Sequence, residues 1–166
     1  MCYPRRPGLS LCLGILLLAG CASILVKPAT SNTSDNREKA ECIAPTIGEK
    51  AAFTAVSMIG RPYKYRGNSP AGFDCSGLVQ YSYLAAGLDV PHGTKALKAI
   101  TLPIDETMQT GDLLFFNERG KTYSHVGIYL GGDTFVHAPG TGRQVETESL
   151  EDPHWKSSFV EARRFM

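Results

Sequence analysis

The feature that most constrains the fold is the order of two hydrophobic patterns along the chain. Helical spacing is confined to residues 46–86, where two amphipathic segments are separated by a loop rich in Gly, Pro, Asn and Ser. After Pro91 the apolar residues instead occur in short runs that are typical of strands. Helices followed by consecutive strands predict an α+β domain, with N-terminal helices packed on a mainly antiparallel sheet.

Both helical segments have recognisable ends. Thr46-Ile47-Gly48-Glu49 is a capping-box pattern, and apolar residues follow it at helical spacing until Gly60 and Pro62. The second segment covers residues 75–86 and ends at Gly87, because glycine commonly terminates helices. The predicted strands are residues 112–116, 125–130, 134–138, 144–147 and 159–165.

Residues 1–20 have the pattern of an export signal. Arg5 and Arg6 form a short positive region, and the apolar run 9–19 is shorter than the roughly 20 residues that span a bilayer. The run ends in Leu18-Ala19-Gly20-Cys21, which resembles the lipobox of bacterial lipoproteins. The resemblance implies that Cys21 is acylated and becomes the mature N-terminus. An ordinary secretory signal and an uncleaved anchor are the alternatives.

The residues that follow Cys21 are polar, with few apolar side chains, and predict a flexible tether. A coil of about 25 residues has a root-mean-square reach of roughly 25–30 Å. By analogy with enteric lipoproteins, Ala22 after the lipidated cysteine indicates the outer membrane rather than the inner membrane. The predicted organisation is a lipoprotein signal peptide at 1–20, a lipidated N-terminus and tether at 21–45, and a folded domain at 46–166.

Charge and cysteine content exclude two other classes of protein. The formal net charge is +1 and no basic stripe is present, which argues against nucleic-acid binding. Of the five cysteines, Cys2 and Cys12 belong to the signal and Cys21 to the anchor. Cys42 and Cys75 can pair in an oxidising compartment, but two cysteines are not a disulfide framework. At least one of them is therefore expected to have another role.

Asp74-Cys75-Ser76-Gly77 places a thiol in the first turn of the second predicted helix. The free N–H groups and the positive end of a helix stabilise a thiolate, so we expect a lowered pKa for Cys75. The same N–H groups can hold an oxyanion. A small buried cysteine without catalytic function is the alternative, and suitable histidines downstream favour the nucleophile.

His125 and His137 flank a predicted hairpin. If residues 131–133 form a three-residue loop, Gly127 pairs with His137, and the two imidazoles lie diagonally on one face, about 7–8 Å apart. A two-residue loop would place them on opposite faces of the sheet. Each histidine alone fits a semi-buried structural side chain, whereas the pair together with Cys75 indicates nucleophilic catalysis.

With these motifs in this order, the sequence resembles the NlpC-type cell-wall peptidases, a family of papain-like cysteine peptidases in bacteria. The resemblance covers residues 48–166 and implies a papain-like fold. Its five motifs are Gly60-Arg61-Pro62-Tyr63, Gly72-Phe73-Asp74-Cys75-Ser76-Gly77-Leu78-Val79, Thr110-Gly111-Asp112-Leu113, Ser124-His125-Val126-Gly127-Ile128-Tyr129 and Phe135-Val136-His137-Ala138.

The resemblance also implies a catalytic triad. Cys75 is then the nucleophile, His125 the general base and later the general acid, and His137 the group that orients the imidazole of His125. A thiolate–imidazolium pair suits amide cleavage, because the same imidazolium can protonate the amine that departs.

Three further residues are implied to bind substrate or to stabilise the oxyanion. Tyr63 matches a family tyrosine whose hydroxyl lies near the thiol, with a packed aromatic as the alternative. Asp74 and Ser76 match positions that hold a free amino group of the substrate in some family members. Helix N-capping is the alternative for Asp74.

The predicted function is hydrolysis of a D,L-type amide in peptidoglycan stem peptides or cross-links, by a monomer without a cofactor or metal. The family's usual bond joins γ-D-glutamate to meso-diaminopimelate, and some lipoprotein members cut the D-alanyl to diaminopimelate cross-link instead. An amidase or acyltransferase on the same fold, and a non-catalytic peptidoglycan-binding lipoprotein, are the alternatives. His92-Gly93-Thr94 and Leu97 depart from the family's pattern and leave the substrate preference open.

Overall fold

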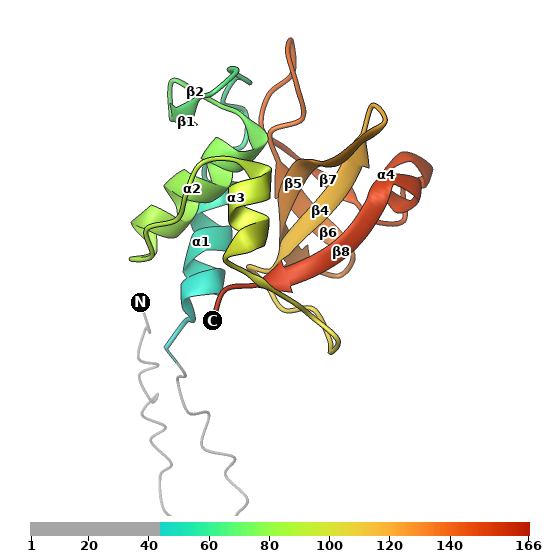
Figure 1. Cartoon of the computed structure of the whole chain (residues 1–166). Coiled ribbons are helices and arrows are strands. Elements are labelled where there is room, and N and C mark those ends of the chain that lie inside the picture. Colours follow the sequence, from blue (N-terminus) through green and yellow to red (C-terminus); the bar gives the residue numbers. More distant parts are fainter. Residues whose placement is uncertain (1–43) are drawn as a thin grey trace, which may run out of the picture. The chain divides into compact units, whose positions relative to one another are not determined.

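The computed structural model describes residues 44–166. Three helices lie on one side of the sheet and a fourth lies on the other (Figure 1). Their bounds are α1 Ile47–Val56, α2 Cys75–Ala85, α3 Thr94–Ala99 and α4 Pro153–Ser158. The predicted signal peptide, Cys21, Cys42 and nearly all of the predicted tether lie outside the described residues.

The main sheet has six strands in the order β3-β8-β4-β5-β6-β7, and every neighbouring pair is antiparallel. The strands are β3 Leu102–Pro103, β4 Leu113–Glu118, β5 Lys121–Gly131, β6 Thr134–His137, β7 Glu146–Ser149 and β8 Phe159–Arg164. A separate two-stranded hairpin, β1 Asn68–Ser69 and β2 Gly72–Phe73, lies beside α2.

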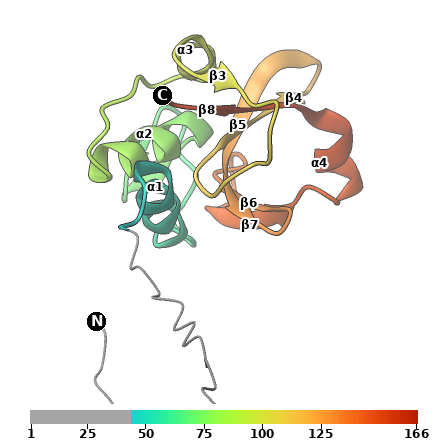
Figure 2. The same cartoon turned by 90° about the horizontal axis from the view of Figure 1, so that it is seen from below.

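The sheet separates two hydrophobic clusters. The larger one joins the buried faces of α1, α2 and α3 to inward-facing residues of β4, β5 and β6. On the opposite face the sheet curls, and α4 closes the concave side (Figure 2). Aromatic side chains dominate this second cluster, where Phe116, Phe135 and Trp155 pack with ring centroids 5.1–5.3 Å apart. The predicted α+β class, with N-terminal helices on a mainly antiparallel sheet, is confirmed.

Local sequence explains why the two long helices begin where they do. Thr46 and Glu49 form the predicted capping box, in which the Thr46 hydroxyl accepts from Glu49 N at 3.1 Å and the Glu49 carboxylate accepts from Thr46 N at 2.7 Å. Asp74 caps α2 by accepting a hydrogen bond from Gly77 N at 2.7 Å. A cap fixes the first residue of a helix, and in α2 that residue is Cys75.

Two short helices and three two-residue strands were not predicted. The helix α3 begins after Gly93 without a side-chain cap, and α4 has only six residues, introduced by Asp152 and Pro153. Elements this short carry less than two turns of hydrophobic periodicity, so the pattern that reveals longer helices is missing. β1, β2 and β3 are too short to show alternation.

The predicted loop of the β5–β6 hairpin is wrong, although the predicted register beyond it is right. The turn consists of two residues, Gly132 and Asp133, both with positive φ (56° and 60°). A bulge at Leu130 inserts one unpaired residue, which restores the pairing of Tyr129 with Phe135. Because side chains alternate between faces, this extra residue returns the two histidines to one face of the sheet.

Within residues 44–166, no helix combines the length and the apolar character that a membrane crossing requires.

Candidate active site

Cys75 is a free thiol at the first residue of α2, partly exposed to a cavity. The backbone at this end of the helix lies close to Gly67, which leads into the β1–β2 hairpin. Asp74 N donates to Gly67 O at 2.9 Å, and a Cβ at Gly77 would lie 1.9 Å from the same oxygen. The absence of a side chain at Gly77 therefore allows the backbone of α2 to approach the hairpin and sets the position of the thiol.

The two histidines are brought together on neighbouring strands. Nε2 of His125 on β5 lies 2.8 Å from Nδ1 of His137 on β6. His125 is 5% exposed and His137 is completely buried. The indole of Trp155 packs on both rings, with centroids 5.4 Å from His125 and 4.7 Å from His137. The pairing that the motifs predicted for these two side chains is present.

Two cavities meet at Cys75. One, of about 320 Å³, is lined by Cys75, His125, Tyr63 and Trp155, and by the β4–β5 loop. The other, of about 610 Å³, is lined by Cys75, Tyr63, Asp74, Ser76 and His92. Cys75, Tyr63 and Ser124 line both, so the two cavities adjoin at the thiol. An extended ligand would have room on both sides of the thiol.

The expected low pKa of the thiol is wrong. Burial raises the pKa of Cys75 to about 12, and the negative charge of Asp74 raises it further. Backbone N–H groups, among them that of Val126, act in the opposite direction but do not compensate. A helix N-terminus stabilises a thiolate, yet here the removal of water around the sulfur outweighs it.

Both histidines are neutral at physiological pH. Burial lowers the pKa of His125 to about 4, with a smaller contribution from His154. Burial also lowers the pKa of His137 to about 2, followed by the charges of His125 and Arg143. The resting site therefore holds a neutral thiol beside neutral imidazoles. The expected thiolate–imidazolium pair is therefore wrong for the resting site.

Asp74 has several hydrogen-bond partners. Its Oδ1 accepts from Gly77 N at 2.7 Å and from the Ser76 hydroxyl at 3.0 Å, and it lies 2.8 Å from Nε2 of His92. The same His92 nitrogen lies 2.9 Å from Oδ2. The helix-capping alternative for Asp74 is thus realised. Ser76 is 5% exposed and contacts this carboxylate.

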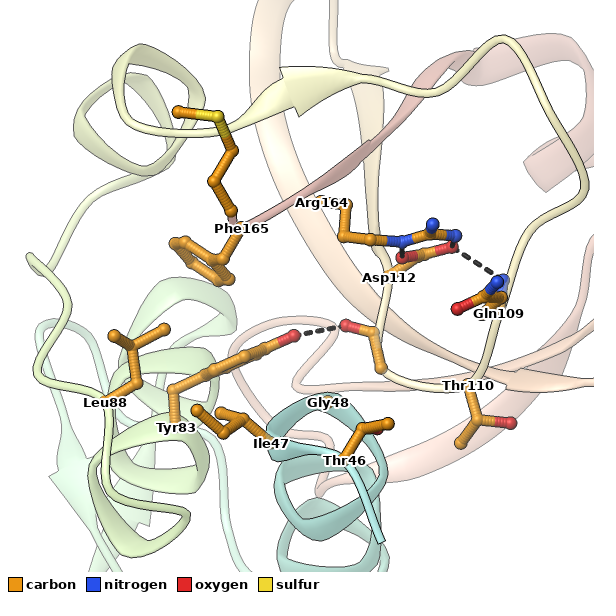
Figure 3. A pocket seen from close by; sticks show the side chains of 12 residues that line it. Thr46, Ile47, Gly48, Tyr83, Leu88, Gln109, Thr110, Asp112, Arg164 and Phe165 are labelled. Atoms are coloured by element: carbon orange, nitrogen blue, oxygen red, sulfur yellow. Dashed lines mark hydrogen bonds and ion pairs between the residues drawn. The ribbon is translucent and has the colours of Figure 1, made fainter. Parts of the chain in front are cut away.

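The other end of the domain has a cavity of about 270 Å³, lined by the start of α1, Tyr83 of α2 and the C-terminal Phe165 (Figure 3). Asp112 at its wall binds the Arg164 guanidinium twice, at 2.7 and 2.9 Å, and accepts from Gln109 N. None of the candidate catalytic residues lines this cavity. Asp112, although it belongs to a matching motif, joins two strands and has no contact with the thiol.

Several residues at the site were not predicted from sequence. Trp155 is the one tryptophan in the chain, and its helix is too short for periodicity to reveal it. Arg119, Lys121 and Ser124 line the cavity beside His125 because the β4–β5 hairpin turns there. The pair Asp152-Pro153, which caps and starts α4, is the local signal that would have placed Trp155 on a helix.

Among the described residues, His137, Glu146 and Glu148 bring potential cation ligands together, one atom of each lying within 4.8 Å of the others. Arg143 already supplies a positive charge there, since its Nη2 lies 2.5 Å from Glu146 and 3.2 Å from Glu148. We assign no metal to this group.

A thiol at a helix N-terminus and a histidine on an antiparallel sheet line one cavity, and a second histidine is bonded behind the first. This fold is that of a papain-like cysteine peptidase. The family model described as NlpC/P60 family matches residues 60–164. The chain belongs to this family of cysteine peptidases.

Characterised relatives differ in the bond that their names state. Murein DD-endopeptidase MepH of Escherichia coli K12 is 36% identical over 149 residues, covering 86% of this chain and 54% of that protein. Gamma-D-glutamyl-L-lysine dipeptidyl-peptidase of Bacillus subtilis is 37% identical over 115 residues, covering 67% of this chain and 38% of that protein.

A crystal structure from Staphylococcus aureus, described as similar to lipoprotein of the NLP/P60 family, superimposes with a TM-score of 0.64 at 33% identity. The match covers 75% of this chain and 43% of that one. The chain thus spans about half, or less, of the length of these relatives.

Proposed function

We propose that this protein is a peptidoglycan endopeptidase that cleaves an amide through an acyl-enzyme on Cys75. The observation that carries the proposal is that Cys75 and His125 line one cavity. Behind His125, its Nε2 is hydrogen-bonded to Nδ1 of His137. That bond leaves Nδ1 of His125 as the nitrogen available to the thiol. The names of the relatives support peptidoglycan as the substrate.

In the proposed reaction the thiol proton passes to Nδ1 of His125 as Sγ attacks the scissile carbonyl carbon. Backbone N–H groups at the start of α2 and the Tyr63 hydroxyl stabilise the oxyanion. The tetrahedral intermediate collapses, the C–N bond breaks, and the His125 imidazolium protonates the departing amine. Water then attacks the thioester, with His125 again as the base, and releases a carboxylic acid and the free thiol.

His137 has the supporting role in this mechanism. Its Nδ1 accepts the hydrogen bond from His125 Nε2–H, which fixes the tautomer in which Nδ1 of His125 is free to take a proton. Trp155 packs on both rings and excludes water from the pair.

Of the two candidate bonds, we propose the D-alanyl to diaminopimelate cross-link. The γ-D-glutamyl to diaminopimelate bond is the alternative. Asp74 is the residue that would hold a free amino group of a trimmed stem peptide. Its carboxylate is already hydrogen-bonded to three other partners, namely Ser76, Gly77 and His92. A cross-link within intact peptidoglycan needs no such ammonium site.

Digestion of purified muropeptides tests both parts of this proposal. The full chain in detergent should convert cross-linked dimers to monomers, and the mass of each product identifies the bond that was cut. Cys75→Ser should lower turnover by several orders of magnitude while its melting temperature stays near that of the wild type. Full activity of Cys75→Ser would overturn the mechanism, and binding without any cleavage by the wild type would favour the non-catalytic alternative. Amide transfer to an added amine would favour the acyltransferase.

We also propose that Cys21 anchors the protein to the periplasmic side of the outer membrane. The support is the Leu18-Ala19-Gly20-Cys21 pattern with Ala22 after it. Cys21→Ala should move the protein from the membrane fraction to the soluble fraction, and density-gradient separation of inner and outer membranes should locate the wild type. A Cys21→Ala protein that still sediments with membranes would exclude lipidation as the anchor.

A further inference from the structure

His137 has a buried nitrogen that the mechanism leaves without a partner. Its Nδ1 bonds to His125, whereas its Nε2 is fully buried and makes no hydrogen bond. A buried polar nitrogen without a partner is unfavourable and uncommon in native proteins. His137 lies on β6, which pairs with β7 on the side away from β5.

The direction of the His125–His137 bond determines which atom that nitrogen needs. If Nδ1 of His125 is to accept the thiol proton, its Nε2 must carry a hydrogen and donate to His137 Nδ1. A neutral imidazole carries one N–H, so the proton of His137 must then be on Nε2. Nε2 of His137, the buried nitrogen without a partner, is therefore a donor that needs an acceptor.

The neighbouring strand supplies that acceptor at the matching position. Glu146 on β7 is directly opposite His137 on β6, and Oε1 of Glu146 is also buried without a hydrogen bond. The two groups approach within 4.8 Å. A buried donor without a partner and a carboxylate oxygen that accepts no hydrogen bond thus lie opposite each other in the register of β6 and β7.

Strand register and an existing hydrogen bond distinguish Glu146 from Glu148 as this acceptor. Glu148 Oε1 accepts a hydrogen bond from Arg143 Nη2 at 3.2 Å, and Glu148 is paired in register with Phe135. Arg143 Nη2 lies 2.5 Å from Glu146 Oε1 as an ion pair, without the geometry of a hydrogen bond. On the far side His137 faces His125, and beyond His125 lie His154 of α4, Asp74 and Cys75.

We propose that Glu146 is a positioning residue that accepts a hydrogen bond from Nε2–H of His137 and extends the catalytic relay to Cys75–His125–His137–Glu146. It acts through His137, whose tautomer it fixes, and does not touch the substrate. Arg143 holds the Glu146 side chain in place and balances its charge. This inference rests on the proposed endopeptidase function.

Substitutions at Glu146 test the relay. Glu146→Ala leaves the His137 N–H without an acceptor, so the kcat for muropeptide cleavage should fall about tenfold with KM nearly unchanged. Glu146→Gln keeps an acceptor oxygen and should recover most of kcat. Glu146→Met fills the same volume without an acceptor and should resemble Glu146→Ala, which keeps the test valid if the alanine variant does not fold. Glu148→Ala is the matched control and should change kcat little.

A spectroscopic readout separates positioning from a merely structural role. The ¹⁵N chemical shifts of the imidazole nitrogens report which one carries the proton. In the full chain in detergent, His125 and His137 should both be protonated at Nε2. Glu146→Ala and Glu146→Met should shift His137 toward the Nδ1–H tautomer, and Glu146→Gln should restore Nε2–H. The pH profile of kcat should move together with the tautomer.

The outcomes are distinguishable. Wild-type kcat and tautomers in Glu146→Ala, with Cys75→Ser inactive, would overturn the relay and leave the endopeptidase function standing. An active Cys75→Ser would overturn the function itself. A metal ion held by His137, Glu146 and Glu148 predicts a different result. A chelator would abolish activity, Zn²⁺ would restore it, and Glu146→Gln and Glu148→Gln would lower it equally. That result would also overturn the relay.

Discussion

Nε2 of His92 lies 2.8 Å from one carboxylate oxygen of Asp74 and 2.9 Å from the other. The residue immediately before Cys75 is therefore bonded to the segment that leads into α3. The same carboxylate caps α2 through Gly77 N and raises the pKa of the Cys75 thiol. Asp74 therefore links the position of the thiol to its ionisation.

Replacing Asp74 with Asn should separate these two effects. Asn is about as good a helix N-cap as Asp, so the melting temperature should change little. Removal of the negative charge lowers the pKa of the Cys75 thiol, and alkylation by iodoacetamide at mildly alkaline pH should become several-fold faster. The rate is measured by peptide mass spectrometry of the Cys75 peptide. An unchanged rate would show that the Asp74 charge does not influence the thiol.

Gly77→Ala should disrupt the junction between α2 and the β1–β2 hairpin. The new Cβ would lie 1.9 Å from Gly67 O, and neither backbone can yield without moving the helix end. We expect a loss of unfolding free energy of about 1–3 kcal/mol or more, as for overpacked cores. Gly140→Ala is the control, because a Cβ there meets no atom within 4 Å. Equal stability of both variants in urea titrations would contradict the close approach.

Asp112→Asn should destabilise the fold without changing the chemistry. Asp112 is 2% exposed and makes two hydrogen bonds to the Arg164 guanidinium. Hydrogen bonds to charged groups contribute about 1.5–3 kcal/mol, and we expect a loss of this order. The exposed Asp105 provides the control variant Asp105→Asn. A normal melting temperature with reduced kcat for Asp112→Asn would instead give Asp112 a role in the reaction.

Sequence alone predicts those parts of the fold whose signals extend over several turns or strand residues. The capping box at Thr46 and the Asp74 cap place the first residues of α1 and α2, and alternation locates five strands within a few residues. The β5–β6 turn could not be predicted in detail, because a two-residue turn with a bulge and a three-residue loop give the same register beyond Tyr129. Only the backbone distinguishes them.

For the site, the sequence indicates which residues meet but not their electrostatics. The motifs bring together Cys75, His125 and His137, and the hydrogen bond between the histidines agrees with this. The thiol pKa was predicted in the wrong direction because desolvation depends on the surrounding core, which no local pattern encodes. The contact of Trp155 with both imidazoles is equally non-local.

Stability should decrease in mild acid because His125 and His137 are buried and neutral. Their pKa values are lowered to about 4 and about 2, whereas an unfolded histidine titrates near 6.5. Below about pH 6.5 the unfolded chain thus binds protons that the folded chain excludes. The unfolding free energy should fall by up to about 1.4 kcal/mol per pH unit for each histidine until about pH 4.

Urea titrations across this pH range measure the slope, and His137→Gln serves as the control for the carboxylates that also titrate there. The variant lacks one of the two buried imidazoles, so its stability should depend less steeply on pH. Identical slopes for the variant and the wild type would show that His137 binds a proton as readily in the folded protein as in the unfolded chain.

The last prediction tests whether His137 orients His125. Nδ1 of His137 lies 2.8 Å from Nε2 of His125, and Gln at this position can offer an amide oxygen to the same N–H. His137→Gln should therefore retain much more activity than His125→Gln, which removes the base. His137→Ala should be less active than His137→Gln, because nothing then restrains the ring. Turnover and melting temperature are measured for all three, since His137 is fully buried. Wild-type turnover in a folded His137→Ala would limit the catalytic machinery to Cys75 and His125.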